Sequence, residues 1–207
     1  MIELSPSKLN LMEDCPRCFW LLVNKNVKRP GGPMAGVLTK MDSVIKHYFE
    51  KYRDSGTLPP IIRGKVDAKL ARGIPKTLYY EGEDVKVEGK PDEYLDFDGF
   101  IVPFDHKVSK GKSAEDTHKA YVLQLDFYTF LLKVNNFKTK NEAYLAYYYP
   151  CDCDVHDGVD ITCDVVKIKT DPDRARRVLE KAVRLLNGRM PAPSPECDFC
   201  KYKGLKF

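Results

Sequence analysis

The segment IVPFDHKV, residues 101–108, is a run of apolar residues that ends with an aspartate and a lysine on either side of a histidine. Successive side chains of a strand point to opposite faces, so Asp105 and Lys107 would leave one face about 6.6 Å apart and His106 the other. Opposite charges at the end of an apolar strand are costly to desolvate unless they pair or bind an ion. One interpretation is catalytic: the carboxylate holds a divalent cation and the lysine acts on water or phosphate.

The residues before this segment predict that it is one arm of a β-hairpin. From about residue 77, polar and apolar positions alternate, and Asp98-Gly99 separates two strand-like runs. Pairing outward from that turn sets Asp92 opposite Asp105. Adjacent carboxylates repel each other, and a cation between them offsets this repulsion. Mg²⁺ or Mn²⁺ could bind there, with the main-chain carbonyl of His106 as a further ligand. The alternative is a solvated hairpin whose acids do not act together.

The rest of the chain reads as helices and strands. Residues 5–25 predict a helix followed by a turn at CPRC, and residues 38–53 an amphipathic helix. A long helix is expected over 114–135, strands over 142–150 and 159–170, and a capped helix over 171–188.

Length and composition restrict the function only slightly. The 207 residues fit one domain, and the formal net charge of +4 is small beside 34 basic and 30 acidic side chains, so a polyanionic partner is only weakly favoured. The sequence has neither an apolar tract of membrane-spanning length nor a basic-then-apolar leader. We therefore expect a soluble, cytoplasmic protein with no membrane partner.

The cysteines indicate a metal centre rather than disulfides. Seven cysteines is an odd number, and no export signal precedes them. Two CxxC pairs, Cys15 with Cys18 and Cys197 with Cys200, lie near opposite ends of the chain. Each pair is half of a site, and two pairs complete a tetrahedral set of four thiolates. The alternative is four reduced, metal-free thiols.

Five motifs in order resemble those of a known family. GKPD (89–92), FDHK (104–107) and QLDFY (124–128) resemble the PD-(D/E)XK nuclease superfamily, in the branch that holds RecB-type nuclease domains and the CRISPR-associated Cas-four exonucleases. SPSKLNLMEDCPRCFWL (5–21) resembles the first helix of that branch, and CDFCKYK (197–203) its C-terminal cysteine cluster. The resemblance implies an α/β, restriction-endonuclease-like core, with a central mixed β-sheet flanked by helices, in one domain over 1–207. Residues 1–35 and 189–207 would together form a cysteine metal-cluster subregion that clamps the termini.

The resemblance also implies a reaction and its residues. The protein would be a metal-dependent DNA nuclease that hydrolyses phosphodiester bonds, an exonuclease acting on single-stranded or end-exposed DNA. By position, Asp92 and Asp105 would bind Mg²⁺ or Mn²⁺, and Lys107 would be the catalytic lysine. Gln124 and Tyr128, one helical turn apart, would contact the DNA backbone or brace the metal shell, unless they only pack.

One departure from the family concerns the second helix. Many members carry a metal-binding histidine four positions after a glycine, and this GxxxH pattern is absent here. His47 is the candidate for that ligand, with Glu50 as a less favoured substitute. The departure leaves an alternative function open: a catalytically weak or inactive nucleic-acid-binding subunit of a DNA repair or CRISPR-adaptation complex. A metal-clamped interaction subunit of such a machine is a third hypothesis.

The cysteine arrangement is the second departure. In the resembled branch, one cysteine near the N-terminus and three near the C-terminus enclose an iron–sulfur cluster, usually [4Fe–4S]. Here each end supplies two, so Cys18 would have to provide the fourth thiolate. The expected order is [4Fe–4S] first, Zn²⁺ second and [2Fe–2S] third.

Overall fold

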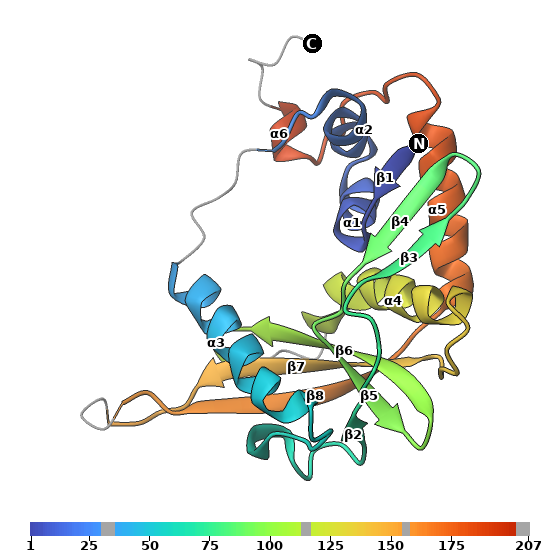
Figure 1. Ribbon diagram of the computed structural model, residues 1–207. Coiled ribbons are helices and arrows are strands. Elements are labelled where there is room, and N and C mark those ends of the chain that lie inside the picture. The colour runs from blue at the N-terminus through green and yellow to red at the C-terminus, as the bar shows by residue number, and fades with distance from the viewer. Residues whose placement is uncertain (30–35, 113–116, 155–157, 202–207) are drawn as a thin grey trace.

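The computed structural model describes residues 1–29, 36–112, 117–154 and 158–201. It is an α/β structure in which helices flank two β-sheets (Figure 1). A five-stranded mixed sheet has the order β2-β5-β6-β7-β8, and a smaller sheet the order β1-β4-β3. The strands are β1 (Ile2–Leu4), β2 (Lys69–Leu70), β3 (Leu78–Glu81), β4 (Val85–Gly89), β5 (Glu93–Phe97), β6 (Phe100–Val108), β7 (Glu142–Pro150) and β8 (Ile161–Lys169). The helices are α1 (Pro6–Asp14), α2 (Pro16–Lys25), α3 (Gly36–Arg53), α4 (Val122–Val134), α5 (Pro172–Leu186) and α6 (Asp198–Lys201), with 3₁₀ turns η1 (Pro60–Ile62) and η2 (Thr117–Tyr121).

The β5–β6 hairpin is the one that the alternating sequence predicts. Phe97 pairs with Phe100, and the two residues between them, Asp98 and Gly99, both have positive φ, at 52° and 91°. This is the backbone of a tight turn whose twist matches that of the flanking strands. β6 then pairs in parallel with β7, and β7 in antiparallel with β8, which makes the sheet mixed.

Two helices cover opposite faces of the five-stranded sheet. α3 packs on one face through Ile45 and Phe49, which lie in a cluster with the β6 residue Phe104. α4 is buried from Leu125 to Leu132 and lies on the other face and under the small sheet. β6 is therefore covered on both sides, and its alternate side chains meet different helices.

The N-terminal segment differs from the expected helix and turn. Cys15 has an extended backbone, with φ −155°, and separates α1 from α2. Pro16 starts the second helix, since a proline fits the first helical turn but disfavours a helical conformation in the residue before it. CPRC is thus the start of a helix rather than a turn after one. Of the helix expected over 114–135, residues 114–116 lie outside the described part of the chain.

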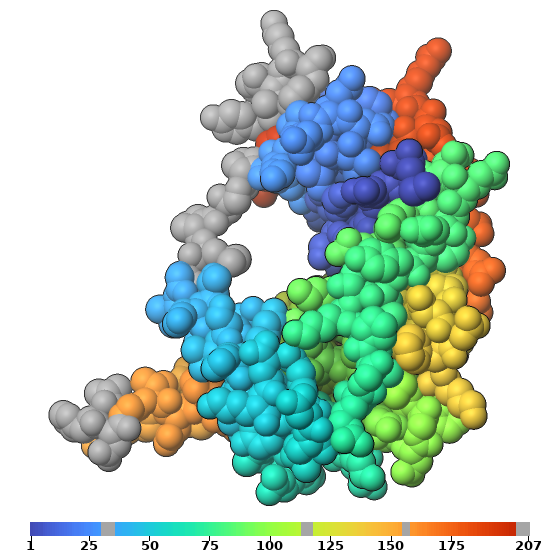
Figure 2. Space-filling model, in the orientation of Figure 1, coloured from blue at the N-terminus to red at the C-terminus, as the bar shows by residue number. Residues whose placement is uncertain are grey.

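The two ends of the chain lie next to each other. α2 contacts both α5 and α6 (Figure 1), and α1 packs on α4 and α5. Figure 2 shows an open space between α3 and the helices α1 and α2, so in this view α3 meets the rest of the molecule at the large sheet. Within the described residues, no helix has the length and apolar character that crossing a membrane requires.

Candidate active site

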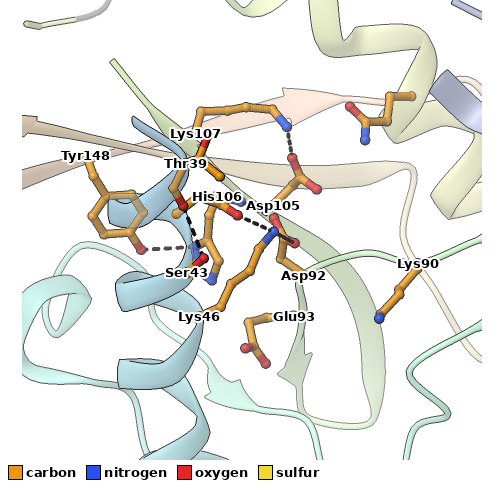
Figure 3. A network of polar contacts seen from close by, with 12 residues as sticks. Thr39, Ser43, Lys46, Lys90, Asp92, Glu93, Asp105, His106, Lys107 and Tyr148 are labelled. Atoms are coloured by element: carbon orange, nitrogen blue, oxygen red, sulfur yellow. Dashed lines mark hydrogen bonds and ion pairs between the residues drawn. The ribbon is translucent and has the colours of Figure 1, made fainter. Parts of the chain in front are cut away.

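Asp92 and Asp105 meet at the open end of the hairpin, as the pairing from its turn predicts. The last β5–β6 pair is Glu93 with Phe104, so Asp92 and Asp105 are the next positions along the two strands. Asp92 Oδ2 accepts a hydrogen bond from the main-chain N–H of His106 at 2.9 Å (Figure 3). The carboxylate thereby takes the place that a strand neighbour would have occupied.

Lys107 lies on the same face of β6 as Asp105, and the two form an ion pair. The Asp105 side chain is 3% exposed and that of Lys107 18%. The Lys107 ammonium is also 4.6 Å from the centre of the Tyr121 ring, a cation–π contact. The lysine is therefore held in one place by a carboxylate and an aromatic ring.

The imidazole of His106 points to the opposite face, into the aromatic cluster under α3. Its ring centre is 4.4 Å from that of Phe49, and its Nδ1 lies 3.1 Å from the hydroxyl of Tyr148. Burial lowers the pKa of this imidazole to about 3, so the ring is neutral. The side chain is thus separated from the two aspartates by the strand, and only the main chain of His106 reaches them.

The main chain of His106 leaves a carbonyl beside the aspartates. In a strand the N–H and C=O of one residue point to the same edge, and the N–H of His106 points to Asp92. β5 pairs with β6 only as far as Phe104, so among the described residues no strand pairs with this edge of β6 at His106. Two carboxylates and one carbonyl form an oxygen donor set of the kind that Mg²⁺ and Mn²⁺ prefer.

The two carboxyl groups have opposite pKa shifts. Burial raises the pKa of Asp105 to about 6, opposed by Lys107 and assisted by the neighbouring Asp92. Burial also acts to raise the pKa of Asp92, but the hydrogen bond from the His106 N–H and the Lys46 ammonium outweigh burial and hold that pKa below its ordinary value. A cation between the two groups would relieve their repulsion.

Lys46 on α3 is part of this group, and sequence reasoning missed it. Its Nζ lies 3.0 Å from Asp92 Oδ1 (Figure 3). The same Nζ lies 2.8 Å from Asp42 Oδ2. The only sequence signal is the i,i+4 spacing of Asp42 and Lys46, which usually marks a surface ion pair on a helix. Asp42 and Lys46 become part of the site only because α3 packs against the hairpin, and this tertiary contact cannot be read from the local sequence.

The structure does not bring His47 to the aspartates. Its side chain is 76% exposed and its Nδ1 lies 3.2 Å from Glu50 Oε2. Adjacent residues on a helix are rotated by about 100°, so Lys46 and His47 cannot face the same group. Glu50 lines the same cleft as Asp92, but it is paired with Arg53 at 3.1 Å.

A cleft of about 550 Å³ opens beside Asp92. Acidic residues on its wall are partly neutralised, since Arg53 Nε lies 3.0 Å from both carboxylate oxygens of Glu93. Lys76 and Lys90 also line it, and neither takes part in an ion pair within the described residues. The basic side chains of the cleft are Lys46, Arg53, Arg72, Lys76 and Lys90.

Gln124 and Tyr128 support the turn that carries Asp92. Gln124 Nε2 donates to the Tyr128 hydroxyl at 2.7 Å, and that hydroxyl donates to the carbonyl of Lys90 at 3.3 Å. Tyr128 is 5% exposed, so its ring is a packing element. The pair therefore lies behind the aspartates and fixes the chain two residues before Asp92.

Comparison with known proteins places this geometry in a family. A family model described as the PD-(D/E)XK nuclease superfamily matches residues 37–205. The chain belongs to this superfamily. The superfamily expected from the motifs is therefore confirmed, whereas the RecB-type and Cas-four branch within it stays a prediction. PD-(D/E)XK nucleases usually use divalent metals, which agrees with the oxygen donors at Asp92 and Asp105.

Comparison with solved structures gives matches at low sequence identity. The crystal structure of SSO0001 has a TM-score of 0.47 and 13% identity, over 90% of this chain and 78% of that chain. The alkaline exonuclease LHK-Exo from Laribacter hongkongensis has a TM-score of 0.47 and 10% identity, over 89% of this chain and 86% of that chain. The sequence matches no curated protein.

The PD-(D/E)XK core of this chain carries a second group, the four paired cysteines. Their sulfur atoms all lie within 4.8 Å of one another, with Cys15 and Cys200 at 3.6 Å and Cys18 and Cys197 also at 3.6 Å. The predicted meeting of the two CxxC pairs is thus present, and the group could hold a metal ion. Of the cysteine subregion, residues 30–35 and 202–207 lie outside the described part of the chain.

One thiol of the group is prepared for ionisation. Burial acts to raise the pKa of Cys197, but the N–H of Cys200 and the neighbouring thiols bring it down to about 7. Arg29 Nη2 also donates to the Cys197 sulfur at 3.3 Å, and Arg29 is paired with Asp14. Thiolates are the form that binds metals, so these contacts favour a bound ion.

Proposed function

We propose that this chain is a metal-dependent deoxyribonuclease, an exonuclease that hydrolyses phosphodiester bonds in single-stranded or end-exposed DNA. The observation that carries the proposal is the convergence of Asp92, Asp105 and Lys107 at one end of the β5–β6 hairpin. Membership of the PD-(D/E)XK superfamily gives this convergence its chemical interpretation.

Asp92, Asp105 and the carbonyl of His106 would hold Mg²⁺ or Mn²⁺. When bound, the ion would polarise the phosphate and acidify a bound water. Lys107, held by Asp105 and Tyr121, would donate a hydrogen bond to the attacking water or to the charge that develops on the phosphate. Tyr128, through its hydrogen bond to the carbonyl of Lys90, would keep Asp92 in position.

The cleft beside Asp92 supports nucleic acid as the substrate, because several basic side chains line it. Lys76 and Lys90 would neutralise backbone phosphates, which makes binding sensitive to salt. The preference for chain ends and the polarity of digestion are tested together with cleavage.

The test is digestion of labelled single-stranded, duplex and circular DNA with Mg²⁺, with Mn²⁺ and with EDTA. Asp105→Asn and Lys107→Ala should each lower the rate about 10²-fold or more, because each removes a group that acts on the reacting phosphate. The matched controls are Asp160→Asn and Lys169→Ala, exposed residues outside the site. Equal cleavage by all four variants would rule out the site, and cleavage of circular DNA would rule out an end requirement.

A second candidate is a catalytically weak or inactive nucleic-acid-binding subunit of a repair or CRISPR-adaptation complex. The observation that favours it is Lys46, which places an ammonium where α3 could have supplied a metal ligand. DNA binding that weakens steeply with salt, without strand cutting under either divalent ion, would select it. Co-purification of a protein partner without affinity for DNA would instead select an interaction subunit.

For the cysteine group we propose a single metal ion. Tetrahedral coordination with metal–sulfur bonds of about 2.3 Å separates the sulfur atoms by about 3.8 Å. Here Cys15–Cys200, Cys18–Cys197 and Cys18–Cys200 lie 3.6–3.9 Å apart, and all four sulfur atoms lie within 4.8 Å of one another. In a [4Fe–4S] cluster each thiolate binds a different iron, which requires wider separations. The spacing thus favours Zn²⁺ over the cluster that the resemblance puts first. Metal analysis and the absorption spectrum of anaerobically purified protein test this: a brown protein with a visible band contradicts it.

A further inference from the structure

The ammonium of Lys46 lies in a position built from carboxylate oxygens of two separate elements. Asp42 comes from α3 and Asp92 from the segment between β4 and β5, and Nζ lies 2.8 and 3.0 Å from their oxygens. The Lys46 side chain is 40% exposed, so the position opens to the cleft. Two carboxylates that converge on one point favour a cation there.

Both aspartates of the proposed active site are therefore matched with a lysine. Asp105 pairs with Lys107 on the α4 face of the sheet, and Asp92 pairs with Lys46 from the α3 face (Figure 3). The second oxygen of Asp92 accepts the N–H of His106. One fixed positive charge thus flanks each side of the oxygen donors.

We propose that the Lys46 ammonium is a built-in second cation of this site, which restricts the protein to one divalent ion and places a fixed charge beside the substrate phosphate. The part that concerns substrate rests on the proposed nuclease function. Lys46 is thus a further positioning residue of the site, contributed by α3.

Electrostatics gives the reason for a single ion. A divalent ion between Asp42 and Asp92 would have to displace the ammonium, which is tethered to α3 and cannot diffuse away. If the ammonium remained within a few ångströms, repulsion between the two charges would oppose binding. Removing the ammonium leaves Asp42 and Asp92 without their cation, so the same position becomes available to a second ion.

The experiment is a count of bound Mn²⁺ by electron paramagnetic resonance and calorimetry, with the full chain and its cysteine centre loaded. The wild type should bind one Mn²⁺ per chain at this site, and the Asp92→Asn/Asp105→Asn double variant should lose it. Lys46→Ala should bind two. Adding Asp42→Asn to Lys46→Ala should return the count to one, because the second position then has one carboxylate fewer.

The matched control is Lys51→Ala, which removes an exposed lysine of the same helix outside the cleft and should leave the count at one. Two ions in the wild type, or a single ion in Lys46→Ala, would overturn the inference. Because the count needs no DNA, it separates the two proposals: uncut DNA with a count that rises on Lys46→Ala rejects the nuclease alone.

Discussion

At the scale of single residues, consecutive residues at the end of β6 lie in different environments: a charged site on one face of the strand and an aromatic core on the other. Asp105 and Lys107 face the side of the proposed metal site, whereas His106 is 2% exposed and its ring is surrounded by aromatic rings. This arrangement assigns His106 two independent roles. Its side chain fills the core under α3, and its main chain faces Asp92.

The two roles of His106 can be separated by mutation. His106→Ala should lower the free energy of unfolding by about 2–4 kcal/mol, because it leaves a cavity beside Phe49 and removes a hydrogen-bond partner of the buried Tyr148 hydroxyl. Mn²⁺ affinity should stay within a few-fold, since the carbonyl remains. Urea denaturation and calorimetry measure the two effects. A folded variant that no longer binds Mn²⁺ would make the imidazole a ligand and contradict this assignment.

The raised pKa of Asp105 predicts how metal binding depends on pH. The free protein holds a proton on Asp105 below about pH 6, the value to which burial raises this pKa. A metal ion must displace that proton, so Mn²⁺ affinity should be constant above pH 6 and fall about tenfold per pH unit below it. Calorimetric titrations between pH 5 and 7.5 measure the slope. Constant affinity down to pH 5 would show that Asp105 is ionised without metal.

At the scale of elements, the hairpin could be predicted because local signals specify it. The Asp98-Gly99 turn fixes the register, and the alternation of β6 fixes which side chains share a face, so the meeting of Asp92 with Asp105 follows from neighbouring residues. The approach of Lys46 does not follow, because α3 reaches the hairpin only through tertiary packing of Phe49. The expected ligand His47 shows the consequence. The sequence indicated that this helix would supply a residue to the site, but not which face of the helix would point there.

The short strands β1 and β2 could not be predicted from the sequence, for a different reason. β1 and β2 contain three and two residues, too few to show alternation, and each exists through its partner strand. The small sheet, to which β1 belongs, affects the site indirectly, because its strand β4 leads into the GKPD turn. Gly89, the last residue of β4, is where this sheet meets α4.

The contact at Gly89 predicts a sensitive position. A Cβ there would overlap Cδ1 of Leu131, which is fully buried on α4. Gly89→Ala should lower the free energy of unfolding by about 1–3 kcal/mol through overpacking. It should also slow the proposed cleavage, because the displaced strand leads directly into the turn that holds Asp92. The control is Gly36→Ala, whose Cβ would meet nothing within 4 Å. Equal free energies of unfolding of the two variants in urea would show that α4 can shift to accept the added Cβ without loss of stability.

At the scale of the whole molecule, the two ends of the chain meet at the four cysteines. Cys15 and Cys18 lie at the junction of α1 and α2, and Cys197 and Cys200 at α6. α1 continues this connection to α4, the helix that carries Gln124 and Tyr128 next to the proposed active site, through apolar packing. We propose on this ground that residues 1–207 unfold as one domain, in a single transition.

Metal removal should therefore weaken the whole protein rather than its ends alone. Cys18→Ser, or chelation of the metal, should cost about 3 kcal/mol or more, which corresponds to roughly 6–12 °C in Tm for a chain of this size, because a metal that binds only the folded state contributes its binding energy to folding. Calorimetry measures Tm and the number of transitions. Cys153→Ser is the control, an exposed thiol outside the group, and should leave Tm unchanged. If Cys18→Ser instead adds a separate low-temperature transition and leaves the main Tm in place, the cysteine region is a domain of its own, and the metal does not stabilise the nuclease core.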